Sequence, residues 1–397
     1  MQFRLSLNIS ESTNPCKSSS LWAVTGDLSS MDHLEHFDDS RHPPGFLLAN
    51  ARADSTFEQI PVIDFANATH PDPVVRRELA NEIRDASVNV GFFYIRNHRI
   101  PEHIISSGLD AAKQFFDLAE NLKQEVRELR LDTAIHLLNV NDIQLDIHKS
   151  MNFKGYTSLL SENADPENIG DLHEAFDLGW EPEEVSLSPT PGLRDDGVMT
   201  GQNVWPEGLP GFRSSVLAYY HAIIRLGQSL FPLFALALDL PENFFDDKTT
   251  KPAAIMRLLH YPPQPTKPID RILGIGAHTD YECFTILWQD SVSALQVMNA
   301  DGKWIDAVPI EGTLVLNLGD QFARWTNDVF KSTVHRVINK SGLERYSIPL
   351  FFGTDYDVKL EPLPSCVSED NPAKYEVVTA GDYVKSRLEA TYSHSKT

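Results

Sequence analysis

The sequence predicts an α+β protein whose β part is a jelly roll. Two observations support this fold class. Segments with helical apolar spacing fill much of the first half of the chain, and from Ala253 onward the pattern changes to short strand-like runs separated by turn residues. Helices followed by strands are typical of α+β chains, and closely spaced short strands with turns between them are typical of an antiparallel sandwich or barrel.

The first half of the chain contains an expected leader and then alternating strands and helices. Residues 1–57 are polar, rich in serine and without apolar periodicity, so we expect a disordered leader. Order should begin with a strand in IPVIDFANA, followed by a helix that closes at Gly91 and a strand in GFFYIRNHRI. A second helix should open at Pro101, and FRSSVLAYYHAIIRLGQSLFPLFALALDL has the strongest helical pattern.

The second half reads as successive strands with a short closing helix. The strand-like runs are AAIMRLLHYPP, RILGIGAHTD, CFTILWQD, ALQVMN, KWIDAVPI, GTLVLNLGD, STVHRVIN and YSIPLFFG, and AGDYVKSRLEATY has helical spacing. We therefore divide the chain into four parts: the leader of residues 1–57, a helical and strand region of 58–250, a jelly-roll core of 251–357, and a C-terminal tail and helix of 358–397.

Composition limits the partners of the protein. There are 56 acidic residues against 34 Lys and Arg, a formal net charge of −22, so phosphate backbones should repel the chain and a nucleic-acid demethylase role is disfavoured. The three cysteines form no CxxC pair, which argues against a disulfide framework or thiolate zinc site. No run of about 18 apolar residues and no secretory signal is found. We expect a cytoplasmic monomer without nucleic-acid or membrane partners.

One His-x-Asp pair is a candidate metal site. The pattern occurs three times, but only His278-Thr279-Asp280 follows strand-like alternation, where residues two apart project to the same side. The next candidate is His335, in the strand-like run STVHRVIN. A single histidine in such a strand is more often a packed core residue than a ligand, so the order of motifs along successive strands carries the prediction.

The third candidate is the pair Arg345-Tyr346-Ser347, which places two donors on one face of a strand. Two imidazoles and one carboxylate on one face of an octahedral iron(II) leave three positions open, although zinc also accepts such ligands. Arg345 favours iron, because a guanidinium fork with the Ser347 hydroxyl suits the distal carboxylate of a bound acid, to which the Tyr261 phenol could donate. A structural ion pair of Arg345 with a surface acid is the alternative.

At these residues the sequence resembles the isopenicillin N synthase-like branch of the iron(II)/2-oxoglutarate-dependent dioxygenases. AHTD, STVHRV and RYSIPLFF are similar to the metal and co-substrate motifs of that family, and the resemblance extends over about residues 60–392. It implies a double-stranded β-helix, or jelly roll, with helices bracing one sheet. The resemblance also implies these residue roles: iron(II) ligation by His278, Asp280 and His335, and binding of the 2-oxoglutarate C5 carboxylate by Arg345 and Ser347 with the help of Tyr261.

The activity implied by the resemblance is hydroxylation, desaturation or cyclisation of a small molecule, of a secondary-metabolite or nucleobase-like kind. Iron(II), 2-oxoglutarate and dioxygen would be required, and succinate and carbon dioxide would be formed. Two alternatives stay open at this point. One is an oxidase on the same scaffold that uses no 2-oxoglutarate, as isopenicillin N synthase does, and the other is an inactive metal-binding or interaction protein.

The sequence departs from the family pattern in two places. Plant members often carry Asn two residues before the position of Tyr261, where this chain has Leu259. A segment of about residues 127–145 has no recognised counterpart, and it is interpreted either as a helix extension or as translated intron.

Several conspicuous residues are expected to have structural roles. Tyr281, Trp325 and Phe352 should lie in the core rather than on a pocket wall, and HEAFDLG, with Glu174 and Asp177, should form a structural turn.

Overall fold

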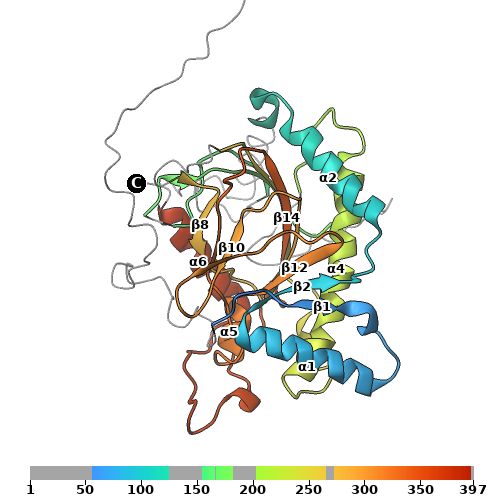
Figure 1. Cartoon of the computed structure of the whole chain (residues 1–397), viewed down its shortest axis with the longest axis vertical. Helices are drawn as coiled ribbons and strands as arrows, with labels where there is room; N and C mark the ends of the chain where they lie inside the picture. Colours follow the sequence, from blue (N-terminus) through green and yellow to red (C-terminus); the bar gives the residue numbers. More distant parts are fainter. Residues whose placement is uncertain (1–55, 125–153, 166, 182–202, 265–271, 395–397) are drawn as a thin grey trace, which may run out of the picture. The chain divides into compact units, whose positions relative to one another are not determined.

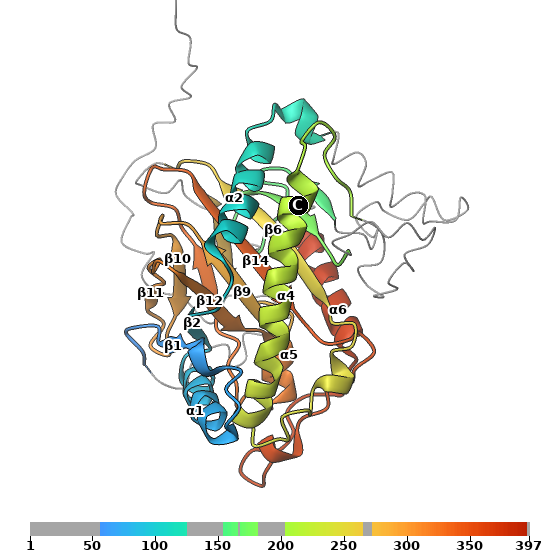
Figure 2. The same ribbon diagram turned by 90° about the vertical axis from the view of Figure 1, so that its right-hand side faces the viewer.

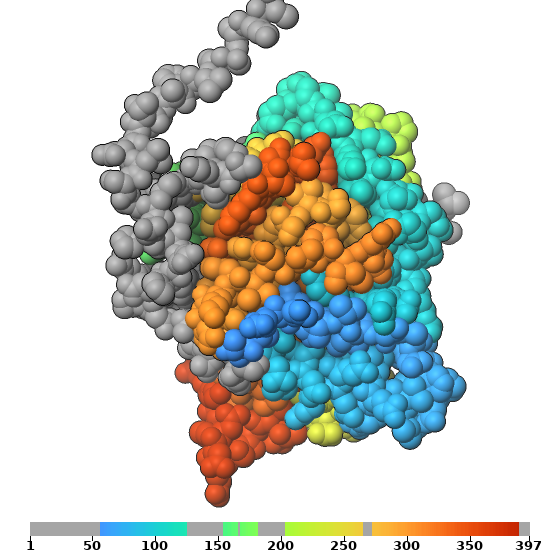
Figure 3. Space-filling model, viewed as in Figure 1, coloured from blue at the N-terminus to red at the C-terminus, as the bar shows by residue number. Residues whose placement is uncertain are grey.

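The structure is a computed structural model of the 397-residue chain, and it describes residues 56–124, 154–165, 167–181, 203–264 and 272–394. The insertion at 127–145 lies outside the described residues, as does the expected leader except for Thr56 and Phe57. Phe57 is buried, and its carbonyl accepts a hydrogen bond from the Asn299 side chain. Figure 3 shows this first described segment, in blue, beside the orange segment that contains Asn299.

The described chain contains helices on both sides of a β core. The helices are α1 (Pro73–Asn89), α2 (Glu102–Phe116), α4 (Phe212–Ala237), α5 (Asp320–Trp325) and α6 (Ala380–His394), with 3₁₀ turns at Phe65–Asn67, Asp246–Lys248 and Pro364–Cys366. The strands are β1 (Val62–Asp64), β2 (Phe92–Arg96), β3 (Gly155–Thr157), β4 (Gly170–Asp171), β5 (Glu174–Leu178), β6 (Ala254–Tyr261), β7 (Ile272–Leu273), β8 (Ile275–His278), β9 (Phe284–Gln289), β10 (Leu295–Met298), β11 (Trp304–Asp306), β12 (Thr313–Leu318), β13 (His335–Val337) and β14 (Arg345–Phe352).

Two sheets form the β core (Figure 1). The larger sheet has eight strands in the order β1-β2-β12-β9-β14-β6-β5-β3, and the smaller has four in the order β11-β10-β13-β8. Strands β1 and β2 pair in parallel, whereas β14 pairs antiparallel with both of its neighbours, β6 and β9. Strands from the expected region 58–250 therefore extend both edges of a sheet whose centre belongs to the expected core 251–357. The mixture of helices and sheets confirms the predicted α+β class.

The segment HEAFDLG differs from its prediction as a structural turn. Residues Glu174–Leu178 form β5, which lies inside the larger sheet between β3 and β6. All five residues of β5 are buried. A strand is favoured here because both of its neighbours supply backbone hydrogen-bond partners, which the local sequence does not reveal.

Helix α4 braces the larger sheet from outside. It is buried along most of its length and contacts α1, α2 and β14, as Figure 2 shows for the two neighbouring helices. Gly227 allows the close approach of helix to sheet, because a Cβ atom at this position would lie less than 3.0 Å from two ring carbons of Phe352. Among the described residues, no helix combines the length and apolar character needed to cross a membrane.

Candidate active site

The residues His278, Asp280 and His335 lie together at the β8 edge of the smaller sheet. His278 ends β8 and His335 begins β13, and the two residues are directly paired across these strands. Asp280 lies in the loop after β8, so the expected single strand carrying both His278 and Asp280 stops two residues early. The Nε2 atoms of both histidines are nevertheless 3.7 Å from Oδ1 of Asp280. Possible ligand atoms of the three residues all lie within 4.8 Å of one another.

Backbone carbonyls orient both imidazole rings. Nδ1 of His278 is 2.8 Å from the Gly276 carbonyl oxygen, and Nδ1 of His335 is 3.1 Å from that of Thr333. A carbonyl only accepts, so Nδ1 of each ring carries a proton, and Nε2 is the ring nitrogen that faces Asp280. Burial, reinforced by the neighbouring His335, lowers the pKa of His278 to about 4, which keeps its ring neutral at physiological pH.

The carboxylate of Asp280 is held by two side chains of the larger sheet. Its Oδ2 accepts hydrogen bonds from Thr285 on β9, at 2.5 Å, and from Asn317 on β12, at 2.7 Å. Burial alone would raise the pKa of Asp280, but the two imidazoles and these two donors outweigh it and hold the pKa below its usual range. The cluster thus combines two imidazole nitrogen donors with one ionised oxygen donor.

Arg345 is a buried cation that lines the same cavity as His278, Asp280 and His335. Only 1% of the residue is exposed, its Nη1 lies 3.3 Å from the Ser347 hydroxyl, and its Nη2 lies 3.2 Å from Oε1 of Gln289. Within the described part of the chain no carboxylate pairs with Arg345, and its Nε has no hydrogen-bond partner. The alternative of a structural ion pair with a surface acid is therefore not observed. A buried guanidinium without a counter-ion is the environment that an acidic ligand would complete.

Tyr261 lies beside this guanidinium. It is fully buried on β6, directly opposite Arg345 on β14, and burial raises the pKa of its phenol, which therefore stays protonated. Leu259 and Gln289 lie on either side of Ser347, on β6 and β9 respectively. The amide that plant members carry at the position of Leu259 is thus absent, and the Gln289 amide is on the opposite neighbouring strand.

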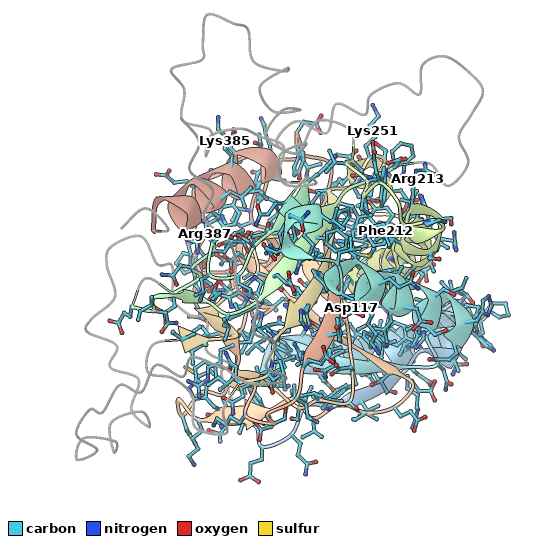
Figure 4. The ribbon with its side chains drawn as sticks, turned by 90° about the horizontal axis from the view of Figure 1, so that it is seen from above. Asp117, Phe212, Arg213, Lys251, Lys385 and Arg387 are labelled. Carbon is cyan, nitrogen blue, oxygen red and sulfur yellow. The ribbon has the colours of Figure 1, made fainter. Side chains whose placement is uncertain are left out.

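The three clustered residues line one cavity of about 230 Å³ between the two sheets, together with Arg345, Ser347, Tyr261 and Leu259. Alternate residues of β6 and β14 form its floor: Ile255, Arg257, Leu259 and Tyr261 from β6, and Arg345, Ser347, Pro349 and Phe351 from β14. Helix α6 closes one side with Val384 and Leu388. In Figure 4, Arg387 lies on the inner side of α6 and Lys385 on its outer side, and the Arg387 guanidinium lies 5.1 Å from the centre of the Tyr281 ring.

A charged group on the cavity wall was not anticipated from the sequence. Arg257 bridges two acids, with Nη2 at 2.8 Å from Glu162 and Nε at 2.6 Å from Asp177. The sequence places Asp177 in a structural turn and indicates no role for Glu162 or Arg257. Arg257 could have been found, because it lies four residues before Tyr261 on the same strand face. Glu162 lies far away in the chain and gives no such signal.

Other residues are placed largely as expected. Phe352 and Trp325 belong to the hydrophobic core, as predicted, whereas Tyr281 lines the cavity, contrary to the prediction. Glu174 is structural: its carboxylate receives hydrogen bonds from Lys123 and Tyr156 and lies 2.8 Å from Nδ1 of His260. Of the two acidic residues in HEAFDLG, Asp177 therefore lines the cavity and Glu174 does not.

Comparison with known proteins identifies the family. The 2OG-Fe(II) oxygenase superfamily model matches residues 252–354, and the model of the non-haem dioxygenase in morphine synthesis N-terminal region matches residues 60–136. The chain is 36% identical over 341 residues to the 2-oxoglutarate-Fe(II) type oxidoreductase hxnY of Emericella nidulans, covering 85% of this chain and 91% of that protein. It is 32% identical to homoarginine-6-hydroxylase of Glycine max, covering 84% of this chain and 97% of the relative.

Solved structures agree with this family. A full-length Neurospora crassa protein in complex with alpha-KG and thymine has a TM-score of 0.69 and 29% identity, covering 86% of this chain and 100% of that one. A 2OG-Fe(II) oxygenase family protein from Caulobacter crescentus has a TM-score of 0.68 and 28% identity, covering 84% and 99%. The predicted jelly roll is thereby confirmed.

The chain belongs to the iron(II)/2-oxoglutarate-dependent dioxygenases of the isopenicillin N synthase-like family. It is a non-haem iron oxidoreductase that uses 2-oxoglutarate and dioxygen as co-substrates. The comparisons support neither the oxidase that dispenses with 2-oxoglutarate nor the inactive binding protein.

Proposed function

We propose that His278, Asp280 and His335 bind iron(II) and that Arg345, Ser347 and Tyr261 bind the distal carboxylate of 2-oxoglutarate. The observation that carries this proposal is the buried Arg345 without a carboxylate partner, in the same cavity as two imidazoles and an ionised aspartate. The donor set fits iron(II), since two nitrogens and one carboxylate oxygen on one face leave adjacent positions for a chelating ligand. Arg345 fits the far end of a dicarboxylate by charge and by its fork of donors.

The protein's own residues bind, orient and protect the reactants. Bound iron(II), with 2-oxoglutarate and dioxygen, supplies the oxidising chemistry that attacks a C–H bond of the substrate. The guanidinium of Arg345 and the hydroxyls of Ser347 and Tyr261 fix the co-substrate at one end of the cavity floor. Leu259 and Leu287 line the same cavity with apolar side chains, so they exclude water around the co-substrate.

The substrate would occupy the other end of the cavity floor. Arg257 lies four positions before Tyr261 along β6, which corresponds to roughly 13 Å of extended strand, so Arg257 and its acidic partners lie beyond the co-substrate anchor. Apolar side chains from Ile255, Phe351 and Val384 line this end together with Arg257 and its two acidic partners. This combination fits a small molecule with polar groups and a hydrocarbon portion, of a secondary-metabolite or nucleobase-like kind, and hydroxylation is the outcome that we propose.

The test couples substrate loss to succinate formation. Purified enzyme with iron(II), 2-oxoglutarate and a panel of small heterocycles and amino-acid derivatives should consume oxygen and form succinate in a 1:1 ratio to oxidised product. Product formed without succinate would instead establish the oxidase alternative. The proposed function would be contradicted if no compound of the panel led to oxygen consumption or to succinate formation. Succinate formed without an oxidised product also counts as turnover in this test. A monomeric state and the lack of nucleic-acid or membrane partners stay predictions.

A further inference from the structure

A row of paired residues crosses three strands of the larger sheet directly behind the metal-binding cluster. Phe92 on β2 is paired with Asn317 on β12, and Asn317 is paired with Thr285 on β9. Residues in register on neighbouring strands project to the same face, so all three side chains point into the cavity side of the sheet. The Phe92 ring meets the His335 imidazole edge to face, with centroids 5.2 Å apart.

The other two members of the row act on one oxygen of Asp280. Both Asn317 and Thr285 donate to Oδ2, at 2.7 Å and 2.5 Å. A carboxylate oxygen has about two lone-pair sites, so Oδ2 is fully used within the protein. Oδ1 is the atom that lies 3.7 Å from Nε2 of both histidines. The two oxygens of Asp280 therefore have different roles before any ion binds.

We propose that Asn317 and Thr285 are positioning residues that restrict Asp280 to coordination through Oδ1 alone; this inference rests on the proposed function. A carboxylate that is free to turn can offer both oxygens to one metal ion and occupy a further coordination position. By holding Oδ2, the two donors keep that position for 2-oxoglutarate and dioxygen. They also fix the Asp280 side chain before the metal binds. The side chain therefore loses less conformational entropy on metal binding.

Register explains why this arrangement needs strands that are distant in sequence. Asn317 is 37 residues from Asp280 and Thr285 is 5 residues from it, yet the pairing of β12 with β9 puts both donors on one oxygen. Shifting β12 by one residue would turn Asn317 to the opposite face. Strands β9 and β12 of the larger sheet thus determine the orientation of Asp280, a proposed metal ligand that lies in a loop.

The test measures metal affinity, which needs no substrate. The full-length protein is freed of metal with a chelator and titrated with cobalt(II) or, without oxygen, iron(II) in a calorimeter. Thr285→Val and Asn317→Leu keep the approximate side-chain shape and remove the donor. We expect each to weaken metal binding by about 10- to 100-fold, as is typical when a partner of a metal ligand is removed. Thr285→Ser keeps the hydroxyl and should retain near-native affinity.

Controls separate positioning from a general loss of folding. Thr313→Val on β12 removes a hydroxyl that donates to the Ile310 carbonyl, away from the cluster, and should leave the affinity unchanged. Thermal unfolding of each metal-free variant reports its stability, and a merely structural role would lower that stability without changing metal affinity. If Asn317→Leu does not fold, the comparison of Thr285→Val with Thr285→Ser decides the question.

The outcomes also distinguish this inference from the proposed function. Metal binding by the native protein that is lost in His278→Ala supports the proposed ligands, whatever the two positioning variants do. Native affinity in both Thr285→Val and Asn317→Leu would overturn the positioning role and leave the proposed function intact. Absence of specific metal binding in the native protein would overturn both.

Discussion

Arg345 and Tyr261 are directly paired residues of β14 and β6, and the Arg345 guanidinium lies 4.9 Å from the centre of the Tyr261 ring. The aromatic face stabilises the cation partly but supplies no negative charge to neutralise it. Ser347 and Gln289 add neutral acceptors at 3.3 Å and 3.2 Å. The charge of Arg345 therefore remains available to a carboxylate that enters the cavity.

Replacing Arg345 by Ala should raise the KM for 2-oxoglutarate steeply. Loss of charge-assisted hydrogen bonds to a carboxylate costs about 1.5–3 kcal/mol, which corresponds to roughly a tenfold to hundredfold weaker interaction. Initial rates measured against 2-oxoglutarate concentration give this value, and calorimetric metal binding should be retained. Arg96→Ala, at an arginine paired with Asp64 on the surface, is the control and should behave as the native enzyme. Unchanged co-substrate dependence in Arg345→Ala would mean that another group binds the distal carboxylate.

Metal should stabilise the native fold through the cluster of His278, Asp280 and His335. A ligand present at 100 times its dissociation constant adds about 2.7 kcal/mol to the free energy of unfolding when it binds only the folded state. Urea unfolding with and without cobalt(II) should show an increase of this size in the native protein. His278→Ala and Asp280→Ala should show little increase, lose activity and keep native circular dichroism. The same cobalt-dependent increase in both variants would place the metal elsewhere.

Local pattern was sufficient to find the proposed metal ligands and the proposed co-substrate anchor as candidates. Strand-like alternation singled out His278 and Asp280 from the two other His-x-Asp pairs, and it placed Arg345 on a strand-like run. The sequence did not show that β8 ends before Asp280, nor that Asn317 and Thr285 hold its carboxylate. Such contacts depend on strand pairing between distant segments, which alternation alone does not specify.

The polar cavity wall was missed for the same physical reason. Asp177 meets Arg257 because β5 pairs with β6 in the larger sheet, and Glu162, 95 residues before Arg257 and outside both strands, contacts the same guanidinium. HEAFDLG is predicted as a turn, although Glu174–Leu178 form β5. Its strand conformation depends on hydrogen bonding to β3 and β6 rather than on the types of its own residues. Residue type indicates which chemistry is possible at a position, whereas topology decides which side chains share a cavity.

The ion pair of Glu162 with Arg257 should make stability depend on pH on the acid side. Burial alone would raise the pKa of Glu162, but Arg257 and His173 hold it well below its ordinary value of 4.5. A depressed folded-state pKa contributes stability above the unfolded value, and this contribution is lost as the pH falls below 4.5. Glu162→Gln should therefore be less stable than the native protein at neutral pH, by about 1–3 kcal/mol, and this difference should shrink in acid.

Urea unfolding at neutral pH and well below pH 4.5 measures this difference. Glu58→Gln, at an exposed residue, is the control for removing one negative charge from a chain of net charge −22. A difference between Glu162→Gln and native protein that stays constant with pH, or grows in acid, would show that Glu162 does not supply this stability.

Gly227 should resist replacement although it lies inside a helix. Alanine is a better helix former than glycine by about 1 kcal/mol, so the substitution would stabilise α4 if the position were open. A Cβ atom at residue 227 would lie less than 3.0 Å from two ring carbons of Phe352, and overpacking of a tight core typically costs about 1–3 kcal/mol. Because Phe352 is itself fully buried on β14, its ring has little room to move, and the clash should exceed the gain in helix propensity.

Gly227→Ala should lower the free energy of unfolding by up to about 2 kcal/mol, whereas Gln228→Ala on the exposed face of α4 should change it by a few tenths. Equal or greater stability of Gly227→Ala in urea unfolding would mean that α4 can shift away from the sheet without loss.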